Sequence, residues 1–512
     1  MLVHEFLENS AGKLPDKVAL ITETGRYNYR LIEEKSRKIS EALMADGLNK
    51  GDRVAVFMDN SLDAVAGIFG ILKAGGVFVI INPTTKVDKL TYILNHCQAS
   101  MMFSSQDKLS MITKCLRNIL SLKSIYVSGY GANLVDTAGK RIIYLKDIFC
   151  GKIVNPAAPV IRATDLASII YTSGSTGVAK GVVMTHHNMV SSANSITQYL
   201  RSSSSDIVLS ALPLSFDYGL YQVIMAFKVG ATVILKKAFG YPYRALETIV
   251  KEKVTGFPIV PTISALITKM ENLKNMKFDC LRYITNTGDA LPADHIKKLR
   301  KIFPKTKIYS MYGLTECKRV TYLDPDQIES RPTSVGKPMP GVETFVVDNC
   351  GKSVGPNVVG ELVVKGPNVM QGYWNMPDET DKFLKYIKAT TDRVLFTGDL
   401  FHYDKEGFLY FVGRKGEMIK SCGEKVSPKE VENVIHGMPS VSEVAVVGVD
   451  DPVLGQAIKA YVVKVNEVDI TNGDIKKYCA KRLEDHMVPK YIEFRSSLPR
   501  TETGKVSKSA LI

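Results

Sequence analysis

The stretch YTSGSTGVAKGVVMTHHN, residues 171–188, sets glycines, hydroxyl side chains and one lysine between two apolar runs. The run DLASIIYT (165–172) before it is typical of a buried strand, and GVVMT (181–185) after it is typical of the returning strand. Thr185 can cap a helix that begins near His186. A loop pinned at both ends in this way is not a flexible linker, so its chemistry must indicate what it holds.

That chemistry suits an anion. Gly174 and Gly177 allow the backbone to turn N–H groups toward one point. The hydroxyl donors and the positive charge come from Ser173, Ser175, Thr176 and Lys180. Such a loop can hold phosphate, but G-x-x-x-x-G-K-[ST] fails because Ala179 occupies its second glycine position, and G-x-G-x-x-G also fails. From the residues alone, a phosphate loop and an ordinary Gly/Ser turn both stay open.

The sequence around this loop alternates strand-like and helical patterns. Residues 27–47 have helical spacing and end at Gly47, and VFVII (77–81) and ATVIL (231–235) are strand-like. Strands separated by helices predict an α/β fold with layered, largely parallel sheets. This pattern defines a large N-terminal domain.

The pattern changes after about residue 340. Short strands with Gly and Asp turns, such as GELVVKG (360–366) and RVLFTGDL (393–400), predict an antiparallel sheet or a small β-barrel-like subdomain. From about residue 417 a compact α+β pattern indicates a small C-terminal domain. We therefore expect one domain over 1–412, a joint over 413–416 and a second domain over 417–512.

Bulk composition narrows the class of protein. A chain of 512 residues is too long for one core. It has no apolar run of membrane-spanning length and no signal-peptide pattern at its start, so we expect a cytoplasmic protein. The eight cysteines form no C-x-x-C pair, so we expect free thiols rather than a zinc site. The net charge of +14 comes from dispersed lysines, which favours anionic substrates or an acidic protein partner over nucleic acid.

With its neighbours, the loop resembles the nucleotide loop of the adenylate-forming superfamily, which includes acyl-CoA synthetases, amino-acid adenylation domains and luciferases. Later motifs match that family in order: YGLTE (312–316), GELVVKGPNVMQGYW (360–374), FTGDL (396–400), GRKGEMIKSCGEKVSPKEVE (413–432) and PRTETGKVSK (499–508). The resemblance covers nearly the whole chain. It departs at Ala179, where proline is common, and we expect this to affect stiffness more than chemistry.

The resemblance implies that ATP and Mg²⁺ bind here. The nucleotide-contacting residues it implies are Thr172, Ser173, Gly174, Ser175, Thr176, Gly177, Thr287, Gly288, Tyr312, Asp399, Arg414 and Lys420. Lys180 and Thr315 are expected to contact phosphate, and Glu316 to help hold Mg²⁺. Lys505 is expected between the substrate carboxylate and the α-phosphate, where a cation offsets the repulsion of two anions.

The implied reaction has two halves. A carboxylate attacks the α-phosphate of ATP to give an acyl-adenylate and pyrophosphate, and a thiol then displaces AMP to form a thioester. The mobile C-terminal domain is expected to rotate between the halves about a hinge at Gly416. The face over residues 418–427 would then border the thiol tunnel, with Gly423 allowing close approach and Lys420 and Lys425 contacting coenzyme A.

Substrate class depends on Phe216 and Asp217. Many acyl ligases of the family have a histidine-plus-aromatic motif here, whereas Phe-Asp resembles amino-acid adenylation domains, in which the aspartate pairs with the substrate α-ammonium. Alternatively, Asp217 only bonds local backbone. The remaining pocket residues are expected to be Tyr218, Tyr221 and Gly313.

Three functions stay open. One is an acyl-CoA synthetase for a small or medium carboxylic acid, with coenzyme A as acceptor. Another is a free-standing amino-acid adenylating enzyme that loads a phosphopantetheinyl carrier protein, expected to be a separate acidic chain. A non-catalytic nucleotide-binding regulator is disfavoured by the joint presence of Lys180, Glu316, Asp399, Arg414 and Lys505.

Overall fold

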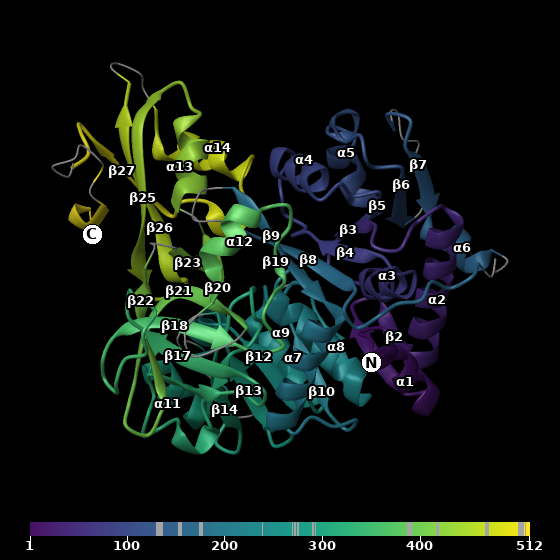
Figure 1. Ribbon diagram of the computed structural model, residues 1–512, viewed down its shortest axis with the longest axis horizontal. Coiled ribbons are helices and arrows are strands. Elements are labelled where there is room, and N and C mark those ends of the chain that lie inside the picture. The colour runs from purple at the N-terminus through teal and green to yellow at the C-terminus, as the bar shows by residue number, and fades with distance from the viewer. Residues whose placement is uncertain are drawn as a thin grey trace.

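The computed structural model describes residues 1–129, 137–151, 156–173, 178–237, 239–268, 270, 273, 276–288, 291, 293–386, 392–415, 419–426, 428–465, 470–499, 506 and 508–511. Its described strands form three sheets, and Figure 1 shows the smallest of them in a separate upper part of the molecule. The predicted α/β fold with an antiparallel region and a small α+β C-terminal part is confirmed. Within the described residues, no helix is long and apolar enough to cross a membrane.

The eight-stranded sheet carries the opening loop. Its strands, in spatial order, are β19 (Gly372–Tyr373), β9 (Ala179–Thr185), β8 (Leu166–Ser173), β4 (Val77–Ile80), β3 (Arg53–Phe57), β5 (Met101–Ser105), β6 (Ser124–Ser128) and β7 (Arg141–Tyr144). Neighbours from β8 to β7 are parallel, while β9 returns antiparallel to β8. Thr172 pairs with Lys180 and Ser173 with Ala179, so the predicted pinning of the loop at both ends is confirmed.

Helices cover this sheet through close contacts. The buried α3 (Leu62–Lys73) packs against α2 (Tyr29–Ala45). Gly70 permits this approach, because a Cβ there would lie 2.5 Å from Ile39 Cγ2. Further helices are α1 (Glu5–Lys13), α4 (Val87–His96), α5 (Leu109–Ile112) and α6 (Leu145–Cys150).

A 14-stranded sheet forms the lower part of Figure 1. Its parallel segment consists of β1 (Val18–Thr22), β11 (Thr232–Leu235), β10 (Ile207–Ser210), β12 (Gly256–Ile259), β13 (Tyr283–Asn286) and β14 (Lys307–Tyr312). Antiparallel strands extend it: β2 (Gly25–Asn28), β15 (Thr321–Tyr322), β16 (Ser334–Pro338), β17 (Glu343–Val347), β18 (Gly360–Lys365), β20 (Leu384–Tyr386), β21 (Arg393–Tyr403) and β22 (Leu409–Arg414). The change to antiparallel pairing after residue 340 agrees with the sequence pattern.

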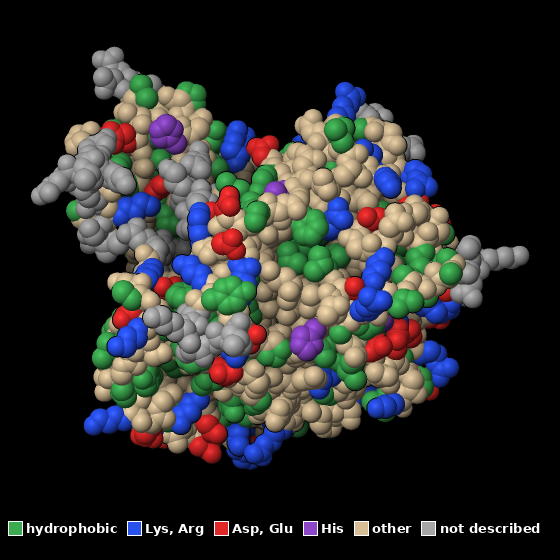
Figure 2. Space-filling model, viewed as in Figure 1, with side chains coloured by type: hydrophobic (Ala, Val, Ile, Leu, Met, Phe, Trp, Pro, Cys, Tyr) green, Lys and Arg blue, Asp and Glu red, His purple; other side chains and the backbone are tan. Residues whose placement is uncertain are grey.

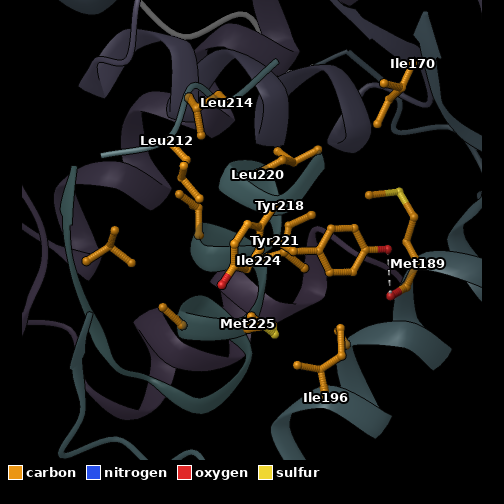
Figure 3. Packing of buried hydrophobic residues seen from close by; sticks show 14 of the residues in the cluster. Ile170, Met189, Ile196, Leu212, Leu214, Tyr218, Leu220, Tyr221, Ile224 and Met225 are labelled. Atoms are coloured by element: carbon orange, nitrogen blue, oxygen red, sulfur yellow. Dashed lines mark hydrogen bonds between the residues drawn. The ribbon is translucent and has the colours of Figure 1, made fainter. Parts of the chain in front are cut away.

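The helices of this region pack around a shared core. They are α7 (His186–Tyr199), α8 (Asp217–Val229), α9 (Pro242–Lys251), α10 (Pro261–Thr268), α11 (Ala293–Ile302) and α12 (Pro377–Phe383). As predicted, Thr185 caps α7, and Asn188 completes a reciprocal capping box. Figure 3 shows Tyr218 and Tyr221 of α8 within this apolar packing, with the Tyr221 hydroxyl directed at Met189.

The C-terminal unit has its own sheet and core. Its strands are β24 (Glu424–Val426), β23 (Ile419–Ser421), β26 (Gly455–Lys464), β25 (Val441–Asp451) and β27 (Tyr491–Arg495). Two helices, α13 (Pro428–His436) and α14 (Asn472–Ala480), bury Val431, Ile435 and Ile475 against it. The exact boundaries 1–412, 413–416 and 417–512 stay a prediction, and the expected hinge residue Gly416 lies outside the described residues.

Candidate active site

A cavity of about 130 Å³ lies where the C-terminal unit meets the two larger sheets. On the face drawn in Figure 2, the surface is hollowed between the C-terminal unit and the part built on the eight-stranded sheet. The residues lining the cavity are Ile80, Ile81, Asn82, Thr85, Lys89, Ile93, Ile170, Tyr171, Thr172, Ser215, Phe216, Asp217, Tyr218, Thr287, Gly288, Gly313, Leu314, Thr315, Lys318, Arg319, Gly423, Glu424, Glu484, His486 and Met487. The set joins the end of β8, the start of α8, the ends of β13 and β14, and the C-terminal unit.

The turn after β14 places Thr315, Lys318 and Arg319 in the lining of the cavity, whereas Glu316 lies off that lining. The turn folds back tightly, because the N–H of Val320 donates to the carbonyl of Tyr312 at 2.9 Å. Gly313 is required there, since a Cβ would lie 2.0 Å from the carbonyl oxygen of Lys318. The buried Asn368 side chain donates to the carbonyls of residues 317 and 319 at 2.7 and 2.9 Å, so the turn is held from behind.

Glu316 offers a carboxylate oxygen for a cation. Its Oε1 accepts a hydrogen bond from Tyr373 Oη at 2.9 Å. Its Oε2 is buried and has no hydrogen-bond partner among the described residues. Within the described part of the chain, no group of three or more His, Cys, Asp or Glu side chains could hold a metal. A Mg²⁺ ion bound by one carboxylate and by substrate phosphates fits this arrangement.

Asp217 is paired inside the protein. Its Oδ1 lies 2.8 Å from Lys318 Nζ, and the two side chains are 9% and 1% exposed. Lys318 adopts a left-handed backbone conformation with φ of 63°, which is uncommon for a residue with a side chain. Next to it, the Arg319 guanidinium lies 4.4 Å from the centre of the Tyr218 ring. The start of α8 and the turn after β14 thus place one buried anion beside two buried cations.

Two glycines bring the C-terminal unit against the end of β13. A Cβ on Gly288 would lie 3.1 Å from the carbonyl oxygen of Gly423, and one on Gly423 would lie 3.1 Å from Val260 Cγ1. Both glycines have positive φ, +91° and +79°, which other residues rarely adopt. The expected close approach of the thiol acceptor at Gly423 stays a prediction. Beside this contact, the Thr287 hydroxyl is buried with no partner among the described residues.

A second contact between the units is ionic. Lys89 Nζ of α4 lies 3.0 Å from carboxylate oxygens of both Glu430 and Glu484, and the Thr85 hydroxyl donates to Glu484 at 3.1 Å. Burial raises the pKa of Glu430. Burial also acts to raise the pKa of Glu484, but the Lys89 ammonium outweighs it and the pKa is lowered. Lys89 therefore joins the C-terminal unit to the eight-stranded sheet.

Several residues predicted from the sequence lie elsewhere. Tyr221 is fully buried and is not among the residues that line the cavity, and its role in the substrate pocket stays a prediction. Lys180 is 4% exposed and pairs with Glu379 of α12, and this ammonium lowers the pKa of Glu379. Tyr312 donates to Asp399 Oδ2 at 2.7 Å. Tyr312, Asp399 and Lys420 also lie off the lining of the cavity.

Other predicted residues fall outside the described part of the molecule. These are Gly174, Ser175, Thr176, Gly177, Gly416, Lys505 and the side chains of Ser173, Arg414 and Lys425. The backbone of Arg414 is described and pairs with Asp399 between β22 and β21. Thr172, Thr287, Gly288, Thr315, Phe216, Asp217, Tyr218 and Gly313 do line the cavity.

Sequence reasoning missed most of the lining residues, among them the charged residues Lys89, Lys318, Arg319 and Glu484. Lys318 and Arg319 directly follow the YGLTE motif and one cysteine, so their proximity to the motif was an available signal. Nothing in the sequence joins Lys89 to Glu484, which are 395 residues apart. That pair exists only through the docking of the two units.

Comparison with known families identifies the class. The chain matches the AMP-binding enzyme family over residues 7–374 and the AMP-binding enzyme C-terminal domain over residues 430–505. It therefore belongs to the AMP-binding enzyme family, and the predicted membership of the adenylate-forming superfamily is confirmed. Its enzyme class is that of the AMP-forming acid–thiol ligases.

Individual relatives span most of the chain. A long-chain-fatty-acid–CoA ligase of Salmonella typhimurium is 31% identical over 99% of this chain and 93% of its own length. Gramicidin S synthase 2 of Brevibacillus brevis is 28% identical over 99% of this chain, which corresponds to 11% of that protein.

A solved relative has been captured in two states. The o-succinylbenzoate CoA synthetase of Bacillus subtilis, as a double mutant bound with the product analogue OSB-NCoA, is 26% identical with a TM-score of 0.86 over 99% of this chain and 98% of its own. The same enzyme with the acyl-adenylate OSB-AMP covers 99% and 97% but has a TM-score of 0.71. The present arrangement is thus more similar to the complex with the product analogue.

Proposed function

We propose that the chain converts a small carboxylic acid to its coenzyme A thioester through an acyl-adenylate. The acid's carboxylate oxygen attacks the α-phosphorus of ATP, and the bond to pyrophosphate breaks. The thiolate of coenzyme A then attacks the acyl carbon, and the bond to AMP breaks. The observation that carries this proposal is the single cavity that joins Thr172 and Thr315 to the C-terminal residues Gly423 and Glu484.

The proposed roles follow the chemistry of each group. Thr172, Thr315 and the loop over 173–177 contact the phosphates, with support from Lys180, which pairs with Thr172 across the hairpin. Glu316 holds Mg²⁺, which would neutralise phosphate charge. Tyr312, Asp399 and Arg414 contact the ribose, because a carboxylate accepts two hydroxyl hydrogen bonds. Lys505 supports adenylate formation only.

Small size is supported by the floor of the cavity. Tyr218 is buried and donates to the Thr285 carbonyl at 2.8 Å, so the ring is fixed across the acyl side. A fixed aromatic ring at this position leaves little room for a long alkyl chain, and we therefore infer a short or compact acid.

The arrangement of the two units supports coenzyme A as the acceptor. The higher TM-score with the product-analogue complex favours a conformation suited to thioester formation. We infer that residues 413–416 act as the joint between domains 1–412 and 417–512, and that Gly423 and Lys420 border the thiol tunnel.

An amino-acid substrate has less support. In that function Asp217 would pair with the α-ammonium of the substrate, but here Asp217 already has Lys318 at 2.8 Å. A second ammonium would have to displace a buried lysine, which costs free energy because the displaced charge loses its partner. This arrangement favours a plain acid over an amino acid.

Pyrophosphate exchange with ATP across a panel of short acids and amino acids tests the first half-reaction. Thioester release on addition of coenzyme A tests the second. We expect exchange with acids and thioester formation with coenzyme A, and a Lys505→Ala variant that loses exchange but still uses a supplied adenylate. Exchange with no acid, or only with amino acids, would contradict the proposal.

A further inference from the structure

Most charged side chains that line the cavity have a group of opposite charge beside them. Lys89 is paired with Glu430 and Glu484, and Glu424 lies 3.3 Å from His486. Asp217 is paired with Lys318. Among the described lining residues, this leaves the guanidinium of Arg319 with no carboxylate partner.

Arg319 is buried, and within the described part of the chain no carboxylate pairs with it. Only 5% of the residue is exposed, and its Nε has no hydrogen-bond partner among the described residues. Its guanidinium carbon lies over the Tyr218 ring at 4.4 Å. A cation–π contact offsets only part of the cost of removing a cation from water. An anionic group on a ligand would offset the rest of that cost.

The backbone fixes this cation in place. The side chain of Asn368 donates to the carbonyl of Arg319 at 2.9 Å, and Lys318 beside it has a left-handed φ of 63°. A preformed donor group that is held by a second layer of hydrogen bonds is typical of a specificity site. Five N–H donors in a planar fork match an oxyanion better than any other ligand group.

We propose that the substrate is an acid with a second acidic group, and that Arg319 binds that group. This inference rests on the proposed function and specifies its substrate class. The reacting carboxylate has to lie at Thr315 and Thr172, where the phosphates bind. Arg319 lines the cavity beside Tyr218 and Phe216 at the acyl side, so it faces the far end of the acid. A short dicarboxylic acid satisfies both the charge of Arg319 and the closed acyl side at Tyr218.

Lys318 does not take part in this recognition directly. Asp217 neutralises it, and the pair keeps the net charge next to Arg319 near zero. A substrate amine is therefore disfavoured twice, because Asp217 is occupied and Arg319 repels a cation. A neutral alkyl end leaves the guanidinium unpaired, and sites of that kind discriminate strongly against analogues that lack the polar group.

Pyrophosphate exchange with chain-matched acids tests the inference. The probes are butanedioate, pentanedioate and hexanedioate, each against the monocarboxylate and the hydroxy acid of equal length. We expect the wild-type kcat/KM to rank dicarboxylate above hydroxy acid above monocarboxylate, with about 100-fold or more between the extremes. Equal values for the mono- and dicarboxylates would overturn the inference while leaving the proposed ligase function intact.

The Arg319→Met variant removes the charge and keeps the length of the side chain. We expect it to lose about 100-fold in kcat/KM for the dicarboxylate and to keep or gain activity on the monocarboxylate. Arg319→Lys should recover part of the loss. Arg244→Met is the matched control, because Arg244 also lies over a tyrosine ring, at 5.2 Å, but is exposed.

Two outcomes distinguish failure of the proposed ligase function from failure of the inference about Arg319. If wild type exchanges with none of the acids, the proposed function fails. If Arg319→Met lowers exchange with mono- and dicarboxylates equally, while calorimetry shows unchanged ATP binding, the inference about the second acidic group is wrong. Folding is checked by that same ATP titration, and loss of an unpaired buried cation is not expected to destabilise the protein.

Discussion

Lys318 Nζ lies 2.8 Å from Asp217 Oδ1, and both side chains are almost fully buried. The pair joins the turn after β14 to the first residue of α8. It brings together residues 101 positions apart in the sequence, and it neutralises one buried carboxylate and one buried ammonium on the acyl side of the cavity. Because Asp217 is already paired with Lys318, it forms part of the cavity wall and is not available to bind the ammonium group of a substrate.

Lys318→Met is expected to lower the free energy of unfolding by about 3–5 kcal/mol, because it leaves Asp217 buried without a counter-charge. The double variant Asp217→Asn with Lys318→Met should regain most of that loss, since no unpaired charge then remains. Urea unfolding of the wild type, both single variants and the double variant forms a complete cycle. Additive effects in this cycle would mean that the two charges do not interact.

Lys89→Met is expected to weaken the docking of the C-terminal unit, because Glu430 and Glu484 lose their common cation. Thioester formation from a supplied adenylate should slow by about tenfold or more, as expected for loss of a buried ion pair, while adenylate formation is preserved. Single-turnover measurements of each half-reaction check this.

Lys86→Met is the matched control for Lys89→Met. Lys86 is also on the docking side, but its Nζ is 4.0 Å from a largely exposed Asp485, and exposed pairs contribute little. Both half-reactions should stay unchanged in this variant. A Lys89→Met enzyme with an unchanged thioester rate would disprove a role for Lys89 in docking.

Local pattern predicted much of the fold. The hairpin of β8 and β9, the cap at Thr185 and the strand before YGLTE depend on contacts between near neighbours in sequence, which propensity and periodicity describe well. The orientation of Tyr221 could not be predicted, because helical spacing alone does not reveal which buried tyrosine faces a cavity and which faces the core. It lies one turn beyond Asp217, directed at Met189.

The charge pattern of the cavity could not be predicted in the same way. The pairing of Asp217 with Lys318 depends on the left-handed backbone of Lys318 and on the close approach of Gly313 to the Lys318 carbonyl. Both features are outcomes of tertiary packing. The contact of Lys89 with Glu484 depends on the relative position of two units. Sequence reasoning therefore located the motifs but left Asp217 open to two interpretations.

Gly423→Ala is expected to impair thioester formation more than adenylate formation. A Cβ at this position, with φ of +79°, would lie 3.1 Å from Val260 Cγ1, so the variant adds both backbone strain and crowding at the docked interface. Gly407→Ala is the matched control, since Gly407 has φ of +84° but nothing within 4 Å of the added Cβ. Similar thioester rates in the two variants would show that strain alone, not contact, accounts for the effect.

The stability of the protein should fall as the pH drops below about 6.5, and His186 is expected to cause part of that fall. Burial lowers the pKa of His186 to about 3 and that of His4 to about 4. His186 Nδ1 accepts a hydrogen bond from the N–H of Val3 at 3.1 Å, which requires the unprotonated nitrogen. Lys73 adds to the effect on His4, whereas Asp165 opposes it at His186.

The direction of this pH dependence follows from the number of protons that the folded and the unfolded chain bind. Below pH 6.5 the unfolded chain binds a proton at each histidine while the folded chain does not, so the free energy of unfolding decreases by up to about 1.4 kcal/mol per pH unit and per histidine. The contribution of His186 is fully present above pH 6.5 and is lost as the pH falls toward 3.

His186→Gln keeps an acceptor for Val3 and should flatten the pH dependence between 6.5 and 4. Urea midpoints across this range measure the slope. His187→Gln, at the exposed neighbouring position, should retain the wild-type slope, and equal slopes in both variants would exclude His186 as the source.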